Sequence, residues 1–345
     1  MGLSLGRFVN NNNIISTQYK DNVIHDKDKR VYLIHIGKAG GETIMINAFG
    51  IGQLGRNGDI KCRMNKTMNG EDDDICYDQW LSNHPKAKDS QLSRHVIGFF
   101  HMHGFAQKKK ERYWLQRNTN TFLFTARDPI DRLISAYNYH RRLKMNITKY
   151  PVYKTFYSEC FPKTFNDMVT DIITVQNYTT CKQLGLSVLR GDHVEGIWLD
   201  GGGHFQYNYK YYLNYSNSEW GINHSIAVIR TEHMWNDIIT LDLMFGGLGK
   251  FDAEGSKFSH KSEKFMNNTD ISQSNVNFLC CFLQNEMEAY QIMILKAFNI
   301  KEAEKHETLS KLYHRCQIKI PRNIPRKPFQ WSEIQHSKSC TTLRR

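Results

Sequence analysis

The sequence predicts an α/β protein, a three-layer sandwich in which a central parallel β-sheet has helices on both faces. The first sign is a set of short runs that are apolar at successive positions, as expected for strands buried on both sides. The second is that a polar turn, and usually an amphipathic helical pattern, follows each run. The four runs are Val31–Ile36, His95–Phe100, Thr121–Thr125 and Ser225–Ile229.

Helical patterns follow the first, third and fourth of these runs, whereas a basic stretch follows the second. The predicted helices are Thr43–Phe49, Ile130–Arg142 and Glu232–Phe245. A longer pattern over Gln273–Phe298 places apolar side chains three or four residues apart, with an irregularity near Asn285. It predicts a helix that packs on the outside of the sheet.

The length of 345 residues and the apolar fraction of 40% suit one large domain, expected over residues 31–315. Residues 1–30 are polar and Asn-rich, and are expected to form a flexible arm. Within the domain, residues 145–222 are rich in Tyr and Asn with few periodic runs, which predicts a helical or irregular insertion. Residues 316–345 are expected to be a basic tail that contains prolines.

The chain carries 46 Lys and Arg against 34 Asp and Glu, a formal net charge of +12. This excess favours an anionic partner: nucleic acid, a sulfated or carboxylated glycan, a membrane surface or a phosphate-rich cofactor. Nucleic acid is disfavoured because the sequence contains no recognisable nucleic-acid-binding module. The apolar runs are also too short to predict a membrane-spanning helix.

The cysteines bear on metal binding and on the compartment. They have no zinc-site spacing among themselves or with His, so no metal is expected. Cys280 and Cys281 lie in an apolar helical pattern and are expected to be thiols in the core. Two pairs in polar stretches are candidates for local disulfides in an oxidising compartment: Cys62 with Cys76, and Cys160 with Cys181.

Motifs for N-glycosylation, Asn-x-Ser/Thr, occur about twice as often as chance predicts, which favours a glycoprotein of the secretory lumen. They begin at Asn65, Asn146, Asn177, Asn214, Asn223 and Asn267.

The segment VYLIHIGKAGGETI combines an apolar strand, a Gly-rich loop and the start of a helix. Three glycines allow successive backbone N–H groups to converge on an anion, and the helix N-terminus adds its positive dipole end. Lys38 supplies a positive charge and Thr43 a further donor. The loop is not a Walker A loop, because Lys38 comes five residues before Thr43. The alternative is an ordinary strand–turn–helix connection.

A second loop lies in FLFTARDPIDRLISAYNYHRR. Arg127 ends a predicted strand, Pro129 is placed to start a helix, and Ser135 lies two turns further on. The planar guanidinium and the hydroxyl can converge on one anion. The alternative is that Arg127 pairs with Asp128 or Asp131.

Between these two loops lies HVIGFFHMHGFAQKKK, where His101 and His103 follow the end of a predicted strand. At a spacing of two, both side chains share one face of extended chain. A neutral imidazole at this edge is suited to accept a proton. The alternative is a structural pair of histidines, and His204 and His260 are given no role.

HIGKAGGET and RDPIDRLISAY together resemble the two cofactor motifs of sulfotransferases that use 3′-phosphoadenosine 5′-phosphosulfate (PAPS). Within that superfamily the chain is most similar to the Golgi carbohydrate enzymes of the heparan sulfate 2-O-sulfotransferase type. The resemblance implies a P-loop-like fold, PAPS as the sulfuryl donor and no metal. It also implies that Arg127 and Ser135 hold the 3′-phosphate. The first loop would hold the 5′-phosphosulfate with Lys38, Ala39, Gly40, Gly41, Glu42 and Thr43.

The same resemblance implies the catalytic roles. His103 is expected to be the base, with His101 next, and Lys38 to lie beside the leaving phosphate oxygen. The sequence SHKSEKF is similar to the family's loop over the nucleotide. It adds three candidate contacts near the 3′-phosphate: Lys261, Ser262 and Lys264.

The expected reaction moves a sulfuryl group from PAPS to a hydroxyl of a carbohydrate, an anionic or neutral glycan such as a glycosaminoglycan. The resemblance does not extend over residues 145–222, the expected acceptor side, so the acceptor sugar stays open. It implies the Golgi lumen, with membrane association only through an anchor outside this chain. The competing classes are a P-loop-type nucleotide kinase and a non-catalytic polyanion-binding protein.

Overall fold

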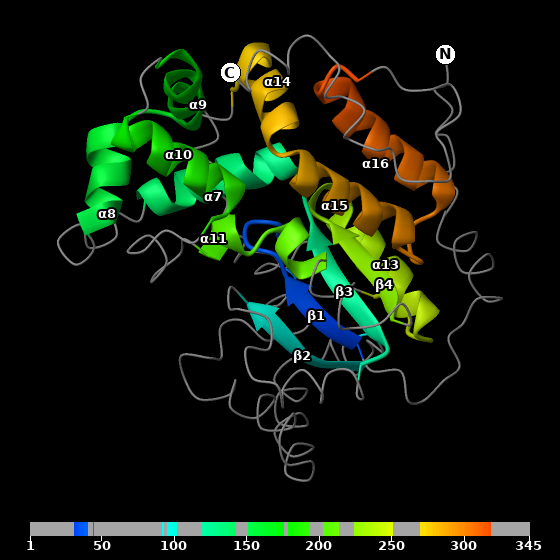
Figure 1. Ribbon diagram of the computed structural model, residues 1–345. Coiled ribbons are helices and arrows are strands. Elements are labelled where there is room, and N and C mark those ends of the chain that lie inside the picture. Colours follow the sequence, from blue (N-terminus) through cyan, green and yellow to red (C-terminus); the bar gives the residue numbers. More distant parts are fainter. Residues whose placement is uncertain are drawn as a thin grey trace, which may run out of the picture.

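A computed structural model of the chain describes residues 31–40, 44, 92, 95–101, 119–142, 151–175, 179–192, 203–213, 224–250 and 270–318. A four-stranded sheet lies at its centre, with the strand order β2-β1-β3-β4 and all neighbours parallel (Figure 1). The strands are β1 (Val31–His35), β2 (Val96–His101), β3 (Thr121–Ala126) and β4 (Ser225–Arg230). Each predicted apolar run therefore forms a strand, and the predicted α/β class with a parallel sheet is confirmed.

Side chains of successive strand residues belong to two different cores. Tyr32 and Ile34 of β1 belong to the larger core, which includes apolar residues of α7 (Pro129–Arg142) and α15 (Gln284–Lys296). Leu33, between them, belongs to a smaller core. This alternation is the physical reason for strands that are apolar at every position.

The smaller core is completed by α13 (Met234–Met244), which contributes Ile238 and Leu241. A short 3₁₀ turn, Thr231–His233, joins this helix to β4. The prediction of a helix over Glu232–Phe245 is thus confirmed apart from its first turn. The predicted helix Thr43–Phe49 lies outside the described residues, except for Ile44, which is buried in the same core.

The described parts of the predicted insertion, residues 145–222, are mostly helical, which is one of the two structures, helical or irregular, that the sequence predicts. They comprise α8 (Pro151–Lys154), a π-helical turn (Thr155–Cys160), α9 (Phe165–Thr174), α10 (Thr180–Arg190) and α11 (Gly203–Gln206). The start of α9 is fixed by a capping box, in which the side chains of Thr164 and Asp167 each accept a hydrogen bond from the other residue's backbone N–H. The Tyr137 hydroxyl on α7 donates to the Phe161 carbonyl at 2.6 Å, which ties this helical block to the core.

The C-terminal helices are α14 (Gln273–Phe282), α15 and α16 (Glu302–Arg315). The break between α14 and α15 falls at Leu283, two residues before the predicted irregularity. Sequence analysis did not predict α16, whose buried face includes Leu309 and Leu312. None of the helices within the described residues has the length and apolar content that a membrane span needs.

Two disulfides join these elements. Cys160–Cys181 links the π-helical turn to α10, which confirms the local pairing that the sequence suggested. Cys280 of α14 pairs with Cys316, just after α16, so the expectation of a free core thiol at Cys280 was wrong. Cys281 is also disulfide-bonded, against the same expectation.

The correction at Cys280 has a structural reason. The two partners are 36 residues apart, and they meet where the end of α16 lies beside α14, which also carries the hydrogen bond from Gln273 to the Arg315 carbonyl. The other suggested local pair, Cys62 with Cys76, lies outside the described residues.

The outer edge of β4 is covered by the residues that follow α15. Ala297 forms an isolated parallel bridge with Ile226, and the Phe298 N–H donates to the Ile226 carbonyl at 3.0 Å. The side-chain amide of Asn299 accepts from the Val228 N–H at 2.9 Å and donates to the Val228 carbonyl at 2.8 Å. A side chain thus continues the hydrogen bonding of the strand.

Candidate functional site

The carboxyl ends of the four strands meet at one edge of the sheet. The register pairs His35 with His101 across β1 and β2, and Ala126 with Arg230 across β3 and β4. Because β1 lies between β2 and β3, the loop after β1 begins between the end of β2 and the loop that carries Arg127 (Figure 1). Open parallel sheets bind their ligands at this edge.

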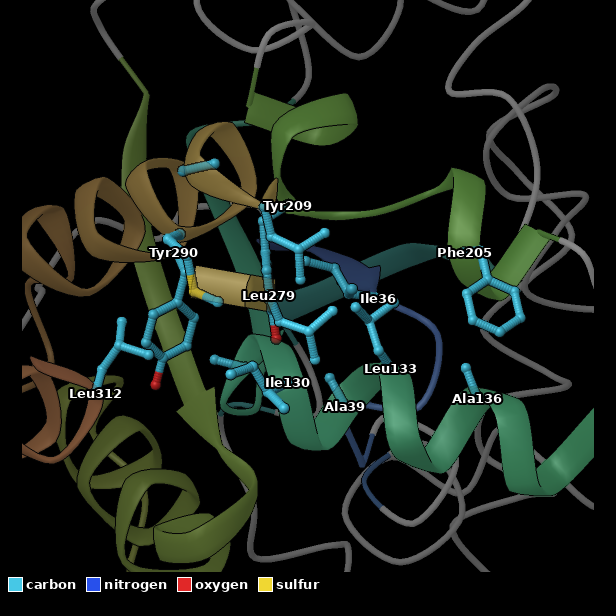
Figure 2. Packing of buried hydrophobic residues seen from close by; sticks show 14 of the residues in the cluster. Ile36, Ala39, Ile130, Leu133, Ala136, Phe205, Tyr209, Leu279, Tyr290 and Leu312 are labelled. Carbon is cyan, nitrogen blue, oxygen red and sulfur yellow. The ribbon is translucent and has the colours of Figure 1, made fainter. Parts of the chain in front are cut away.

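The loop after β1 is tied both to β3 and to α7. The Ile36 N–H donates to Oγ1 of Thr125 at 3.1 Å, and the Ala39 N–H donates to the Ile36 carbonyl at 3.1 Å, which closes a tight turn. Figure 2 shows Ile36 and Ala39 beside Leu133 of α7, and all three are buried in the larger core. The loop therefore follows a fixed path at its start.

Two residues of this loop adopt left-handed backbone conformations. Gly40 has a φ of 79°, and a Cβ there would lie 2.9 Å from Cε of Met234 and 3.1 Å from Oγ1 of Thr231. Lys38 has a φ of 65°, which is uncommon for a residue with a side chain. Strained backbone of this kind is concentrated at functional sites.

The ammonium group of Lys38 lies over the ring of Tyr139 on α7, with Nζ 3.7 Å from the ring centroid. Ser135 precedes Tyr139 by one helical turn, so their side chains project from the same side of α7. The structure therefore places the predicted residues Lys38 and Ser135 beside the same side of one helix.

The backbone around Arg127 is held from two directions. Asp128 caps α7, because its Oδ1 accepts from the N–H groups of Ile130 and Asp131 at 2.9 and 3.1 Å. The Tyr209 hydroxyl accepts from the Arg127 N–H and donates to the Arg127 carbonyl, each at 2.7 Å. Burial raises the pKa of this hydroxyl far above its usual value.

The two carboxylates near Arg127 pair with a different arginine. Nη1 of Arg315, at the end of α16, lies 2.8 Å from Oδ1 of Asp128 and 2.8 Å from Oδ1 of Asp131. Within the described part of the chain, the guanidinium of Arg127 and the hydroxyl of Ser135 have no hydrogen-bond or ion-pair partner. The alternative in which Arg127 pairs with Asp128 or Asp131 was therefore wrong.

A pair of histidines that the sequence did not single out lies beneath the first loop. Nδ1 of His204 and Nε2 of His140 are 2.8 Å apart, and both residues are buried. Burial lowers the pKa of His140 to about 3, and the nearby charge of Lys38 adds to this shift. A side chain at Gly37 would overlap the His204 ring, so that glycine lets the loop lie against the pair.

A buried ion pair holds His204 in place. The Arg132 guanidinium, 1% exposed, donates to the His204 carbonyl at 2.5 Å and pairs with Glu286 at 2.9 Å. Glu286 also accepts from the N–H groups of Tyr209 and Lys210, at 3.2 and 3.1 Å. Residues 203–213 are in this way fastened to both α7 and α15.

No pattern in the sequence points to these supporting residues. Their partners come from segments more than 60 residues away, and one His among 15 carries no pattern of its own. For Arg132 the one available clue was its place among apolar neighbours on α7.

The other predicted residues lie in β2 or outside the described residues. His101 is the last residue of β2, and its Cα is paired with that of His35. The remaining predicted positions lie outside the described residues: Gly41, Glu42, Thr43, His103, Lys261, Ser262 and Lys264.

Among the described residues, no cluster of three or more His, Cys, Asp or Glu side chains is arranged to hold a metal ion. Comparison of the chain with protein-family models, with curated proteins and with solved structures gives no match.

Proposed function

We propose that the protein is a sulfotransferase that moves a sulfuryl group from PAPS to a hydroxyl of a carbohydrate acceptor. One observation carries the proposal. Among the residues that the structure describes, the guanidinium of Arg127, at the carboxyl edge of a parallel sheet, has no hydrogen-bond or ion-pair partner, although two carboxylates follow it closely in the chain. A free guanidinium at that edge is suited to bind a phosphate group.

The described residues fit the donor at both of its anionic ends. Arg127 and Ser135 supply a guanidinium and a hydroxyl that lack a partner in the described part of the chain, and these two groups would hold the 3′-phosphate. Lys38 and Gly40 have left-handed backbone conformations, which also occur in anion-binding turns, and a turn of that kind would hold the 5′-phosphate. PAPS would supply the sulfuryl group.

The roles of the chain's own residues follow from the strand order. The end of β2 lies next to the start of the first loop, so a base at His103, or at His101, would be close to the phosphate site. Lys38 would offset the charge that grows on the departing phosphate. His103→Ala should abolish sulfuryl transfer from labelled PAPS, and full activity in that variant would contradict the assignment of the base.

The proposal extends to the fold and the compartment. The two cores on opposite faces of the sheet support a P-loop-like three-layer sandwich. The disulfides Cys160–Cys181 and Cys280–Cys316 are compatible with a protein of the secretory pathway, and we assign it to the Golgi lumen.

Calorimetric titration with 3′-phosphoadenosine 5′-phosphate (PAP), the desulfated product, tests the donor class directly. AMP lacks the 3′-phosphate and ATP carries its phosphates elsewhere, so both serve as controls. Wild-type protein should prefer PAP, and Arg127→Ala should weaken PAP binding by at least about tenfold. Arg190→Ala removes the same charge from an arginine that lies over the Phe282 ring, and should leave PAP binding unchanged.

Either of two results would overturn the proposal. Equal binding of ATP and PAP would favour a nucleotide kinase. Failure to bind any of the three nucleotides would favour a non-catalytic polyanion-binding protein.

A further inference from the structure

We propose that Arg315 is a positioning residue that keeps Arg127 available for the 3′-phosphate, by occupying the two carboxylates that would otherwise capture it. The inference rests on the proposed function for the identity of the ligand. That Arg315 keeps Arg127 available is inferred from the contacts of Arg315 with Asp128 and Asp131 at the start of α7.

Arg315 forms ion pairs with both carboxylates at the same time. A single nitrogen, Nη1, lies 2.8 Å from Asp128 and 2.8 Å from Asp131. Burial raises the pKa of the Asp128 carboxyl, and the positive charge of Arg315 opposes that shift. Asp128 is already committed to capping α7, whereas Asp131 has a side chain that is 44% exposed. Asp131 is therefore the carboxylate most able to turn towards Arg127.

Arg315 is itself held in place by its surroundings. The next residue, Cys316, is joined to Cys280 of α14 by a disulfide. Nε2 of Gln273, at the start of α14, donates to the Arg315 carbonyl at 3.0 Å. The end of α16 is thus fixed against α14, and its last side chain reaches the start of α7.

The charges explain what the loss of Arg315 would do. The formal charges of Arg127 and Arg315 together balance those of Asp128 and Asp131. Without Arg315 the net charge of Arg127, Asp128 and Asp131 is negative, which would repel a phosphate dianion. In addition, Arg127 would be drawn to one of the two carboxylates. Both effects oppose binding of a 3′-phosphate.

The preference of the protein for PAP over AMP measures the contribution of the 3′-phosphate. Arg315→Met keeps most of the length of the side chain and removes its charge, and should reduce this preference by at least about tenfold. Arg315→Met combined with Asp131→Asn should recover most of it, because the carboxylate that competes for Arg127 is gone. Arg190→Met, whose guanidinium contacts an aromatic ring, is the matched loss of charge and should have no effect.

An unchanged preference in Arg315→Met, or failure of Asp131→Asn to restore it, would overturn the inference. If Arg315→Met does not fold, Arg315→Gln serves in its place, since it retains a donor for Asp128. The expected loss and the contradicting result are the same for that variant.

A second readout needs no nucleotide. Phenylglyoxal modifies free arginines faster than ion-paired ones, and peptide mass spectrometry gives the rate at each site. Arg127 should react faster than Arg315 in the wild type, slow down in Arg315→Met, and recover when Asp131→Asn is added. Wild-type protein that shows no preference for PAP would overturn the proposed function, whereas an unchanged Arg127 rate in Arg315→Met would overturn the role of Arg315.

Discussion

The Tyr209 hydroxyl bridges the backbone of Arg127, accepting a hydrogen bond from its N–H and donating one to its carbonyl, each at 2.7 Å. Tyr209 is fully buried, and its own N–H is bound by Glu286. A residue of the predicted insertion thus sets the position of a residue at the candidate phosphate site.

Tyr209→Phe should leave the Arg127 N–H and carbonyl without their partner, at a cost of about 1 to 3 kcal/mol in unfolding free energy. The preference for PAP over AMP should fall as well, because the Arg127 backbone, and with it the guanidinium, is no longer held in position. Urea unfolding and calorimetry measure the two effects. Tyr137→Phe is the matched control: it loses a buried hydroxyl–carbonyl bond of 2.6 Å to Phe161 and should reduce stability but not nucleotide preference. Equal effects of both variants on preference would contradict the prediction.

Lys38 combines a left-handed φ of 65° with a side chain that the proposed mechanism requires. Lys38→Ala and Lys38→Gly should both abolish transfer from labelled PAPS, but Gly should be more stable than Ala by about 1 kcal/mol, because Gly adopts positive φ without strain. Both variants lack the Lys38 side chain, so the difference in stability between them measures the backbone strain at this position. Gln317 has a φ of 53°, and Gln317→Gly should relieve similar strain while activity is kept. A Lys38→Gly variant no more stable than Lys38→Ala would count against strain in the loop.

The buried Arg132–Glu286 pair should be far more sensitive than pairs on the surface. Arg132→Met leaves the Glu286 charge buried and unpaired, at an expected cost of about 3 to 5 kcal/mol. Adding Glu286→Gln should recover part of that loss. The exposed Lys311–Glu307 pair, also at short distance, gives the control: Lys311→Met should cost less than about 1 kcal/mol. Urea unfolding checks all of these variants, and similar losses for Arg132→Met and Lys311→Met would refute the prediction.

His140 should make stability depend on pH in the acid range. Its pKa is lowered to about 3 in the folded protein, against about 6.5 in an unfolded chain, so the unfolded state binds the proton first as pH falls. The stabilisation is complete above about pH 6.5 and is lost towards pH 3, by at most about 1.4 kcal/mol per pH unit. The difference in unfolding free energy between wild type and His140→Gln should shrink accordingly. His314→Gln, at an exposed position on α16, is the control and should track the wild type.

The sequence predicted those parts of the fold that depend on local pattern. Strands β1, β3 and β4 are apolar at successive positions because their side chains enter two cores on opposite faces of the sheet. That pattern can be recognised in the sequence without knowing which elements cover each face. The same holds for α7, whose start is marked by Asp128 and Pro129. In α16, charged residues outnumber the buried apolar ones such as Leu309 and Leu312, which hid the helical face.

The supporting contacts of the site could not be predicted because they join distant segments. Arg315 contacts Asp128 across 187 positions, and Glu286 contacts Arg132 across 154. The local alternative, in which Arg127 pairs with Asp128 or Asp131, stayed open because the sequence does not show that Arg315 contacts both carboxylates. Cys280 was assigned as a thiol for the same reason, since Cys316 is distant in sequence.

The residues that cover the outer edge of β4 bear on self-association. The outermost strand of a sheet normally offers unpaired backbone groups, to which a strand from another molecule can add. Here Phe298 occupies the Ile226 carbonyl, and the amide of Asn299 occupies both backbone groups of Val228. These backbone groups are therefore not available to a strand of another copy, which disfavours the growth of an intermolecular sheet along β4.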